Sequence, residues 1–150
     1  FPYTTLFRSE DLDFPNGMVI TPGGDTLIVA ESTGRRLTAF SIAADGSLSE
    51  RRVFAEGLDG PPDGICLDQQ GAVWAAMTLA NAFERIEPGG TVTDRIEFDD
   101  RVAIACTLGG PNRRTLFMLT ATSAYPQRLV GARLARLDAT VVDVPGAGLP

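Results

Sequence analysis

The strongest constraint on the fold is an internal repeat. Three units begin at Pro15, Pro62 and Ala105, so they follow one another at intervals of about 45 residues. Each unit reads as a short strand, a turn rich in Pro, Gly, Asp, Gln or Asn, an apolar strand, an alternating strand and a fourth strand. This spacing is typical of four-stranded propeller blades, and the sequence therefore predicts an all-β fold of about three such blades.

The strands within a unit differ in their apolar pattern. First strands are expected over Met18–Thr21, Ile65–Asp68 and Cys106–Leu108. The second strands, "TLIVA", "AVWAA" and "TLFML", are apolar at nearly every position, which indicates a sheet covered on both faces. The third strands alternate ("RLTAFSI", "AFERIE", "ARLARL"), and fourth strands are expected at "RRVFA", "VTDRIEF" and "TVVDV".

Three blades do not close a propeller, because complete rings hold about four to eight blades. We therefore expect an incomplete ring with open strand edges. The first nine residues, "FPYTTLFRS", match no repeat, and their reverse translation resembles a sequencing-library adapter read in frame. We expect residues 1–9 to be an artefact and residues 10–150 to be the C-terminal half of a propeller domain, with the natural N-terminus missing.

Composition excludes several partners and chemistries. The net charge of −6 argues against nucleic acid or an anionic membrane surface as partner. No apolar run reaches the ~20 residues of a membrane span. The absence of histidine removes the usual zinc ligand and the Ser–His and Cys–His pairs, so Ser32 has no catalytic partner of that kind. Cys66 and Cys106 lie in apolar runs, where reduced core thiols of a cytoplasmic protein are favoured over a disulfide.

The tripeptides P-N-G and P-D-G mark the same point in the first two units. Asn16 and Asp63 come directly before the first strand, which lines the central channel of a propeller, so both side chains should converge on the axis. The third unit has Ala105 there, so the corner does not itself demand an oxygen-bearing side chain. A carboxamide and a carboxylate suit a hard divalent cation. The alternative is that Asn-Gly and Asp-Gly act only as turn formers.

The segments "FPNGM", "GDTLIVAES", "PPDGICLD", "GAVWAA" and "ACTLGGP" resemble the regucalcin/gluconolactonase (sugar lactone lactonase) family of six-bladed propellers. The likeness runs from about Asp13 to Pro150 and corresponds to the C-terminal half of the ring. It implies a divalent ion held by an Asn and an Asp of consecutive blades and by a Glu of an earlier blade. Asn16 and Asp63 match the first two ligands, whereas the Glu and the sugar-binding residues are expected upstream of residue 10. Glu31 is not the missing ligand, because it is expected at the far end of a second strand.

The resemblance implies hydrolysis of a sugar lactone. A divalent ion, Ca²⁺ or Zn²⁺ with Mn²⁺ or Mg²⁺ as alternatives, would polarise the carbonyl for attack by water, and Asp63 would also take the proton from that water. We expect the chain by itself to have little activity, and we expect no obligate protein partner. Two alternatives stay open. One is a propeller that binds calcium or a protein partner without turnover, and the other is a related enzyme for phosphotriesters or other lactones, with substrate choice set by Met77 and Phe83.

Overall fold

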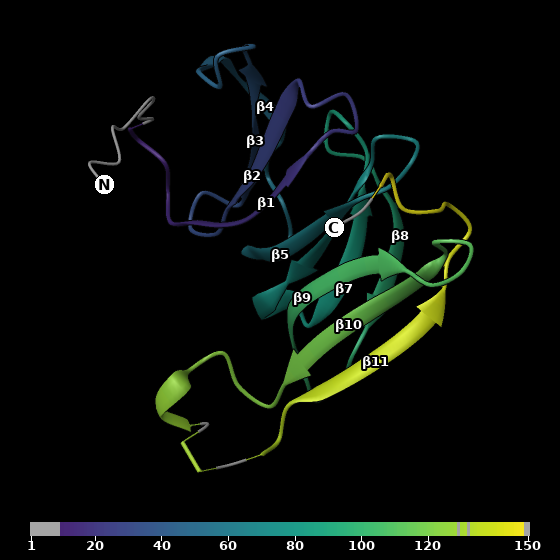
Figure 1. Cartoon of the computed structure of the whole chain (residues 1–150). Coiled ribbons are helices and arrows are strands. Elements are labelled where there is room, and N and C mark those ends of the chain that lie inside the picture. The colour runs from purple at the N-terminus through teal and green to yellow at the C-terminus, as the bar shows by residue number, and fades with distance from the viewer. Residues whose placement is uncertain (1–9, 129, 132, 149–150) are drawn as a thin grey trace, which may run out of the picture.

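The computed structural model describes residues 10–128, 130–131 and 133–148, so the predicted adapter segment lies outside the described residues. The described chain forms three antiparallel sheets that follow one another in sequence (Figure 1). We call them blades 1, 2 and 3. Each is a meander in which neighbouring strands in the chain pair with each other, which confirms the predicted β-propeller architecture with an incomplete ring.

Blade 1 consists of β1 (Pro15–Ile20), β2 (Thr26–Glu31), β3 (Arg36–Ile42) and β4 (Leu48–Ala55). Blade 2 consists of β5 (Pro62–Leu67), β6 (Val73–Met77), β7 (Ala82–Ile86) and β8 (Val92–Glu97), with the short 3₁₀ helix η1 (Thr78–Ala80) between β6 and β7. Blade 3 consists of β9 (Val102–Gly109), β10 (Thr115–Ala121) and β11 (Arg136–Val141), with the 3₁₀ helix η2 (Pro126–Arg128) before β11. Among the described residues, no helix is long and apolar enough to cross a membrane.

Blade 3 differs from the four-stranded pattern expected for each unit. The described part of this sheet has three strands, and the outermost begins at Arg136, so that only the last two residues of the predicted "ARLARL" strand belong to it. The chain leaves β10 through η2, and the predicted fourth strand "TVVDV" instead contributes its first two residues to β11. The following segment turns back to blade 2, where the Ala147 amide donates to the Leu67 carbonyl at 3.0 Å. The chain therefore uses these backbone groups to tie blades 2 and 3 together.

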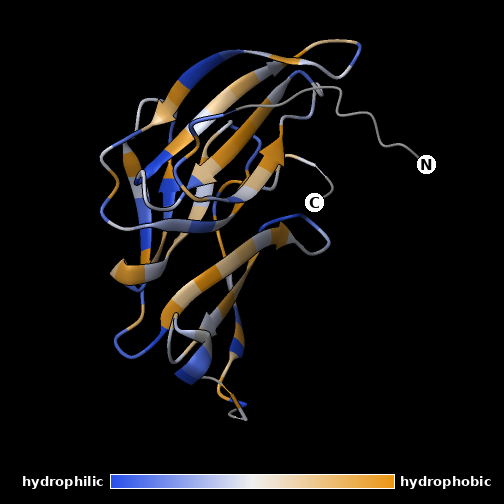
Figure 2. Cartoon of the chain, turned by 90° about the vertical axis from the view of Figure 1, so that its left-hand side faces the viewer, coloured by the Kyte–Doolittle hydropathy of each residue, from blue (hydrophilic) through white to orange (hydrophobic). Residues whose placement is uncertain are grey.

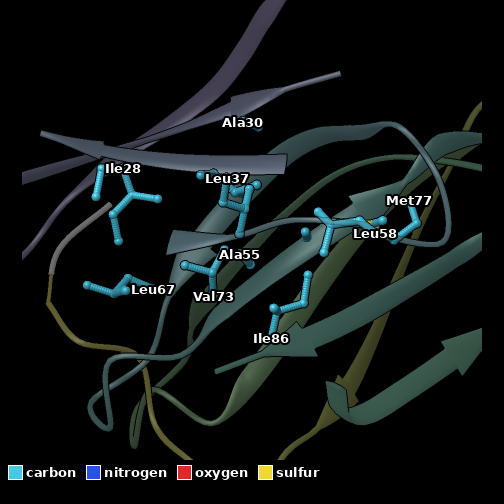
Figure 3. Close-up of a cluster of buried hydrophobic side chains, with 12 residues drawn as sticks. Ile28, Ala30, Leu37, Ala55, Leu58, Leu67, Val73, Met77 and Ile86 are labelled. Carbon is cyan, nitrogen blue, oxygen red and sulfur yellow. The ribbon is translucent and has the colours of Figure 1, made fainter. Parts of the chain in front are cut away.

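Two apolar clusters lie between the blades. One joins blades 1 and 2 (Figure 3), and the other joins blades 2 and 3. Because blade 2 is covered on both faces, all residues of β6 are buried, as its continuous apolar run predicts. The run in β10 alternates in burial instead, and Leu119 is 48% exposed, because only one face of blade 3 is covered by a described blade.

The edges of the blades are polar where the centre is apolar. The outermost strands β4 and β8 are mostly exposed and rich in charged residues, and hydrophilic stretches mark the periphery in Figure 2. The innermost strands β1, β5 and β9 lie side by side toward the middle of the molecule (Figure 1). The predicted site residues belong to these inner strands, which therefore decide where the site lies.

Candidate functional site

The P-N-G tripeptide is part of an inner strand and contains a β-bulge. In blade 1, Pro15 pairs with Glu31 and the next pair joins Met18 to Val29, so β1 carries one more residue than β2 over this interval. Asn16 and Gly17 together lie opposite a single residue of β2, and both belong to β1 and not to a turn before it. The expectation that the strand starts at Met18 is therefore corrected, and the tripeptide is not simply a turn former.

Blade 2 repeats the same irregularity. Pro62 pairs with Met77 and Ile65 pairs with Ala75, so the extra residue falls at Asp63 and Gly64. A β-bulge re-aims the side chain that it carries, and such bulges are common beside functional sites. Asn16 and Asp63 thus occupy equivalent bulged positions of two adjacent inner strands.

Blade 3 makes the bulge as well, without a polar side chain. Ala103 pairs with Thr120 and Cys106 pairs with Met118, so two residues again oppose one. This register puts Ile104 at the position of Asn16 and Asp63, and it puts Ala105 at the position of the glycines. The predicted alignment of Ala105 with Asn16 was one residue out of register, because blade 3 lacks the Pro and Gly that mark the bulge in sequence.

Close packing between the blades requires glycine at Gly17 and Gly64. An added Cβ at Gly17 would lie 2.5 Å from the Asp63 carbonyl oxygen, and one at Gly64 would lie 2.6 Å from the Ala105 Cα. Both contacts are with backbone and leave no room for a side chain. Ala105 has no further described blade beside it and can carry a methyl group. The glycines therefore let adjacent bulges approach until their neighbouring side chains meet.

The side chains of Asn16 and Asp63 do meet. Asn16 lies close enough to the Asp63 carboxylate to lower its pKa, and the Thr78 hydroxyl donates to Asp63 Oδ2 at 3.5 Å. Asp63 is partly buried, and this desolvation raises its pKa above the ordinary value even though the bonds from Thr78 and Asn16 act in the opposite direction. No arginine or lysine of the described residues forms an ion pair with Asp63. Its negative charge is therefore poorly compensated.

Glu31 shows how the fold treats a carboxylate that it does compensate. This side chain is fully buried at the end of β2, where Arg36 contacts both of its oxygens and Thr38 donates to Oε1. Although burial opposes ionisation, the bonds from Arg36, Thr38 and the Asp13 amide lower the pKa of Glu31 to about 2. The sequence-based reason for excluding Glu31 as a ligand is corrected, because Glu31 pairs with Pro15 and therefore lies at the same end of blade 1 as Asn16. What distinguishes Glu31 from Asp63 is that its oxygens are bonded by Arg36, Thr38 and the Asp13 amide.

Two hydroxyl residues hold the bulge of blade 2 in place. The Ser32 hydroxyl, which is buried, donates to the Pro62 carbonyl at 2.7 Å, and the Thr78 amide donates to the Pro61 carbonyl at 3.0 Å. Pro61 and Pro62 have no amide hydrogen, so these carbonyls are their only backbone groups for hydrogen bonding. Together with the bond from Thr78 to Asp63, each residue of 61–63 therefore accepts a hydrogen bond from Ser32 or Thr78, the residues that follow β2 and β6.

Ser32 and Thr78 were missed as site residues by sequence reasoning. Both follow the last residue of a second strand, since Glu31 and Met77 pair with the equivalent prolines of β1 and β5. Their shared position after the second strand could have identified them from the sequence, but only the strand register shows that this position lies beside the bulge. Met77 and Phe83, expected to influence substrate choice from loops, are instead fully buried in β6 and β7.

A groove of about 830 Å³ runs along the inner strands next to the bulges. Its lining is largely apolar and comprises Met18, Val19, Ile20, Thr21, Pro22, Leu27, Ile65, Cys66, Leu67, Cys106, Thr107, Leu108, Gly146, Ala147 and Gly148. Asn16 and Asp63 do not line it, because the groove begins beyond them along each strand. The described residues contain no cluster of three or more His, Cys, Asp or Glu side chains able to hold a metal ion. Within this part of the chain, Asn16 and Asp63 are the two oxygen donors that the bulges bring together.

Residues 4–122 match the family model described as the SMP-30/gluconolactonase/LRE-like region. The chain belongs to this family. It is similar to 6-deoxy-6-sulfogluconolactonase of Pseudomonas putida, with 28% identity over 145 residues that cover 93% of this chain and 50% of the relative. This family assignment confirms the resemblance predicted from the sequence.

Solved structures of the family give the same picture. A gluconolactonase from Xanthomonas campestris is 33% identical, with a TM-score of 0.62 over 74% of this chain and 36% of that chain. Regucalcin from Agrobacterium tumefaciens, described as a calcium-binding protein, has a TM-score of 0.71 at 22% identity over 91% of this chain and 48% of that chain, which establishes the fold. The chain spans about half the length, or less, of the relatives it matches. Relatives named as lactonases support sugar lactone hydrolysis at the level of the family.

Proposed function

We propose that the protein containing this chain hydrolyses sugar lactones with the help of a divalent cation, and that this chain supplies Asn16 and Asp63 to the cation site. The observation that supports the proposal most is the repeated bulge, which places a carboxamide and a carboxylate of two blades close to each other. The same bulge in blade 3 carries Ile104, so the backbone feature does not by itself require polar side chains.

The chemistry of the two donors fits a hard divalent cation. Asp63 is a partly buried carboxylate with a raised pKa and no basic residue paired to it among the described residues. Asn16 lowers the pKa of Asp63, which is the effect of an amide group that donates toward the carboxylate, and in the proposed site its carbonyl oxygen is the atom that would ligate the cation. Carboxylate and carbonyl oxygens suit Ca²⁺, Mg²⁺ and Mn²⁺, and Zn²⁺ also accepts a carboxylate oxygen. A cation would supply the missing countercharge.

The proposed reaction adds water to the lactone carbonyl and opens the ring to a hydroxy acid. A bound divalent cation would polarise the carbonyl and lower the pKa of water. Asp63 takes the proton from the attacking water, and Thr78 and Asn16 orient its carboxylate for that role. The bond between the carbonyl carbon and the ring oxygen breaks, and the ring oxygen gains a proton. Sugar lactones are activated esters, so this scheme needs no serine or cysteine nucleophile.

We also propose that the chain alone has little lactonase activity. It supplies two oxygen donors from two blades, whereas the relatives named as lactonases are at least about twice as long. Acid release from glucono-1,5-lactone by the full-length protein, with and without a chelator, tests the proposal. We expect chelation and Asp63→Asn each to abolish hydrolysis, while Asp99→Asn, the same change at an exposed carboxylate, leaves it intact.

Two outcomes would redirect this proposal. Full hydrolysis by the Asp63→Asn protein would remove Asp63 from the mechanism. Cation binding that depends on Asp63, without hydrolysis of any sugar lactone, would support a propeller that binds calcium or a partner and does not turn over substrate.

A further inference from the structure

The two cysteines of the chain face each other across the interface between blades 2 and 3. Cys66 lies on β5 and Cys106 on β9, in successive inner strands. Their Sγ atoms are 3.8 Å apart, and both thiols are free. Both side chains belong to the apolar cluster that joins these two blades. A pair of residues separated by 40 positions in sequence is thus in direct contact through the fold.

The interface between blades 1 and 2 has other residues at the two positions that the cysteines occupy. By strand register, Cys66 is equivalent to Val19 of blade 1, and Cys106 is equivalent to Ile65 of blade 2. Val19 and Ile65 pack in the cluster between blades 1 and 2. Aliphatic side chains therefore satisfy this contact between inner strands. In the second interface both members of the contact are thiols, which supplies a chemistry that the first interface lacks.

The thiol pair is reached from the groove along the inner strands. Both cysteines line this space of about 830 Å³, although Cys66 and Cys106 are only 8% and 9% exposed. The surrounding wall is mostly apolar, with Leu67 directly after Cys66 and with Thr107 and Leu108 after Cys106 along their strands. A small uncharged oxidant fits such an approach better than a bulky or charged disulfide reagent does.

We propose that Cys66 and Cys106 are a site of oxidation, at which hydrogen peroxide converts the thiol pair into a disulfide that joins blade 2 to blade 3. One thiolate attacks peroxide and becomes a sulfenic acid, with release of hydroxide. The other thiol then attacks the sulfenic sulfur, the S–S bond forms, and water leaves. Overall, the two thiols lose two electrons and two protons, and one peroxide molecule is reduced to two water molecules.

The order of the two thiols follows from their surroundings. The hydrogen bond with Cys66 and the burial of the side chain raise the pKa of the Cys106 thiol well above its ordinary value. Cys106 also contacts the Trp74 carbonyl oxygen, with its Sγ at 3.4 Å. Because this shift disfavours the Cys106 thiolate, the proposal assigns the first attack on peroxide to Cys66 and the second step to Cys106.

The cross-link requires a modest rearrangement. The sulfurs must close from 3.8 Å to a bond of roughly 2.05 Å. The proposal therefore requires the two side chains to rotate toward each other within the cluster. The disulfide closes a long loop of the chain, and such a loop is the kind whose closure most stabilises a folded state.

The test treats the folded chain with hydrogen peroxide and then measures intact mass, the cross-linked peptide and the melting temperature. The matched control is the double variant C66V/C106I, which copies the Val19 and Ile65 pair of the preceding interface. We expect a monomer lighter by the mass of two hydrogen atoms at the cysteine-containing peptides. Its melting temperature should rise by about 5–10 °C, and reductant should reverse the rise. The double variant should show neither change.

A single variant keeps the proposal open to refutation if the double variant folds poorly. In C106I, peroxide should leave a sulfenic acid on Cys66 that a dimedone-type probe captures. The proposal is overturned if the folded chain yields only intermolecular dimers or singly oxidised thiols. It is also overturned if the internal cross-link forms only after the chain is unfolded in urea.

Discussion

The inner strands of blades 1 and 2 share one backbone feature with the inner strand of blade 3, yet they differ in what that feature carries. All three strands bulge at the same point of their pairing with the second strand. Blades 1 and 2 place Asn16 and Asp63 there, whereas blade 3 places Ile104. This difference separates the role of the backbone bulge from the role of the side chain that it carries, which the sequence alone does not distinguish. The bulge belongs to the way these blades are built, and the oxygen-bearing side chains are an addition to it.

The residues after the bulge follow a second rule. Gly17 and Gly64 each face the backbone of the next blade at a distance that excludes a side chain, whereas Ala105 is the last of the series among the described residues. Glycine here reflects contact between blades and not an unusual backbone angle.

The largest effect is expected for Gly64→Ala. The new methyl group would overlap the Cα and Cβ of Ala105, both at 2.6 Å, and the backbone of blade 2 or blade 3 would have to shift. We expect a loss of about 2–3 kcal/mol in the free energy of unfolding, measured by urea denaturation. Gly148→Ala is the matched control, because an added Cβ there meets no atom within 4 Å. Equal stability of the two variants would contradict the packing argument.

Asp63→Asn should affect cation affinity more than stability. The substitution keeps the shape of the side chain and removes its charge, so the two bulges would offer neutral oxygens only. Changes in outer-shell partners cost roughly 10–100-fold in metal affinity, and loss of a charged ligand should cost at least about 100-fold. Isothermal titration of the chain with Ca²⁺ or Mn²⁺ measures this. Asp99→Asn serves as the control, and an affinity unchanged by Asp63→Asn would place the cation elsewhere.

Ser32→Ala should weaken the anchoring of the blade 2 bulge from blade 1. The variant leaves the Pro62 carbonyl without its 2.7 Å hydrogen bond in a buried position. We expect a loss of about 1 kcal/mol in the free energy of unfolding together with a weaker cation affinity. Ser32→Thr keeps the hydroxyl and should restore cation affinity more than Ser32→Ala does. If Ser32→Ala lowers stability but not affinity, the hydroxyl does not position Asp63.

The smallest effect is expected in the pH dependence of stability. Because the pKa of Asp63 is raised above 3.8 by desolvation, the folded state binds this proton more tightly than the unfolded state does. The contribution of Asp63 to stability therefore falls as pH rises from 3.8 through the raised pKa. Glu31 acts in the opposite sense, since its contribution is present above 4.5 and is lost as pH falls toward about 2.

Urea unfolding of the wild-type chain and of Asp63→Asn at a series of pH values, without divalent cation, isolates the contribution of Asp63. Relative to the variant, the wild-type chain should lose stability as pH rises through this window and then level off. A gain in relative stability over the same window would mean that Asp63 is compensated in the folded state.

The sequence predicted most of blades 1 and 2 because their strands carry strong local patterns. The continuous apolar run of β6 indicated a sheet covered on both faces, and all of its residues are buried. Blade 3 was harder to predict because the chain between its second and third strands passes through η2, and because the residues after β11 bond to blade 2 and do not form a fourth strand of this sheet in the described chain. Local alternation in "ARLARL" could not reveal that the strand starts only at Arg136.

The candidate site was predicted in its residues and not in its geometry. Asn16 and Asp63 were identified from a repeated tripeptide, but the bulge that re-aims them depends on the pairing of β1 with β2 and of β5 with β6. Ser32 was set aside because the chain has no histidine, although its hydroxyl acts on the backbone next to Asp63. Hydrogen bonds between blades depend on tertiary contacts that no single repeat encodes.

Paramagnetic broadening of amide resonances by Mn²⁺ in the ¹⁵N-labelled chain tests the shared cation site most directly. If the two bulges form a cation site, the strongest broadening should centre on Asn16 and Asp63 together, and Asp63→Asn should abolish it. Broadening centred on the exposed Asp99 and Asp100 instead, or none at either bulge, would contradict the claim that these two blades share a cation.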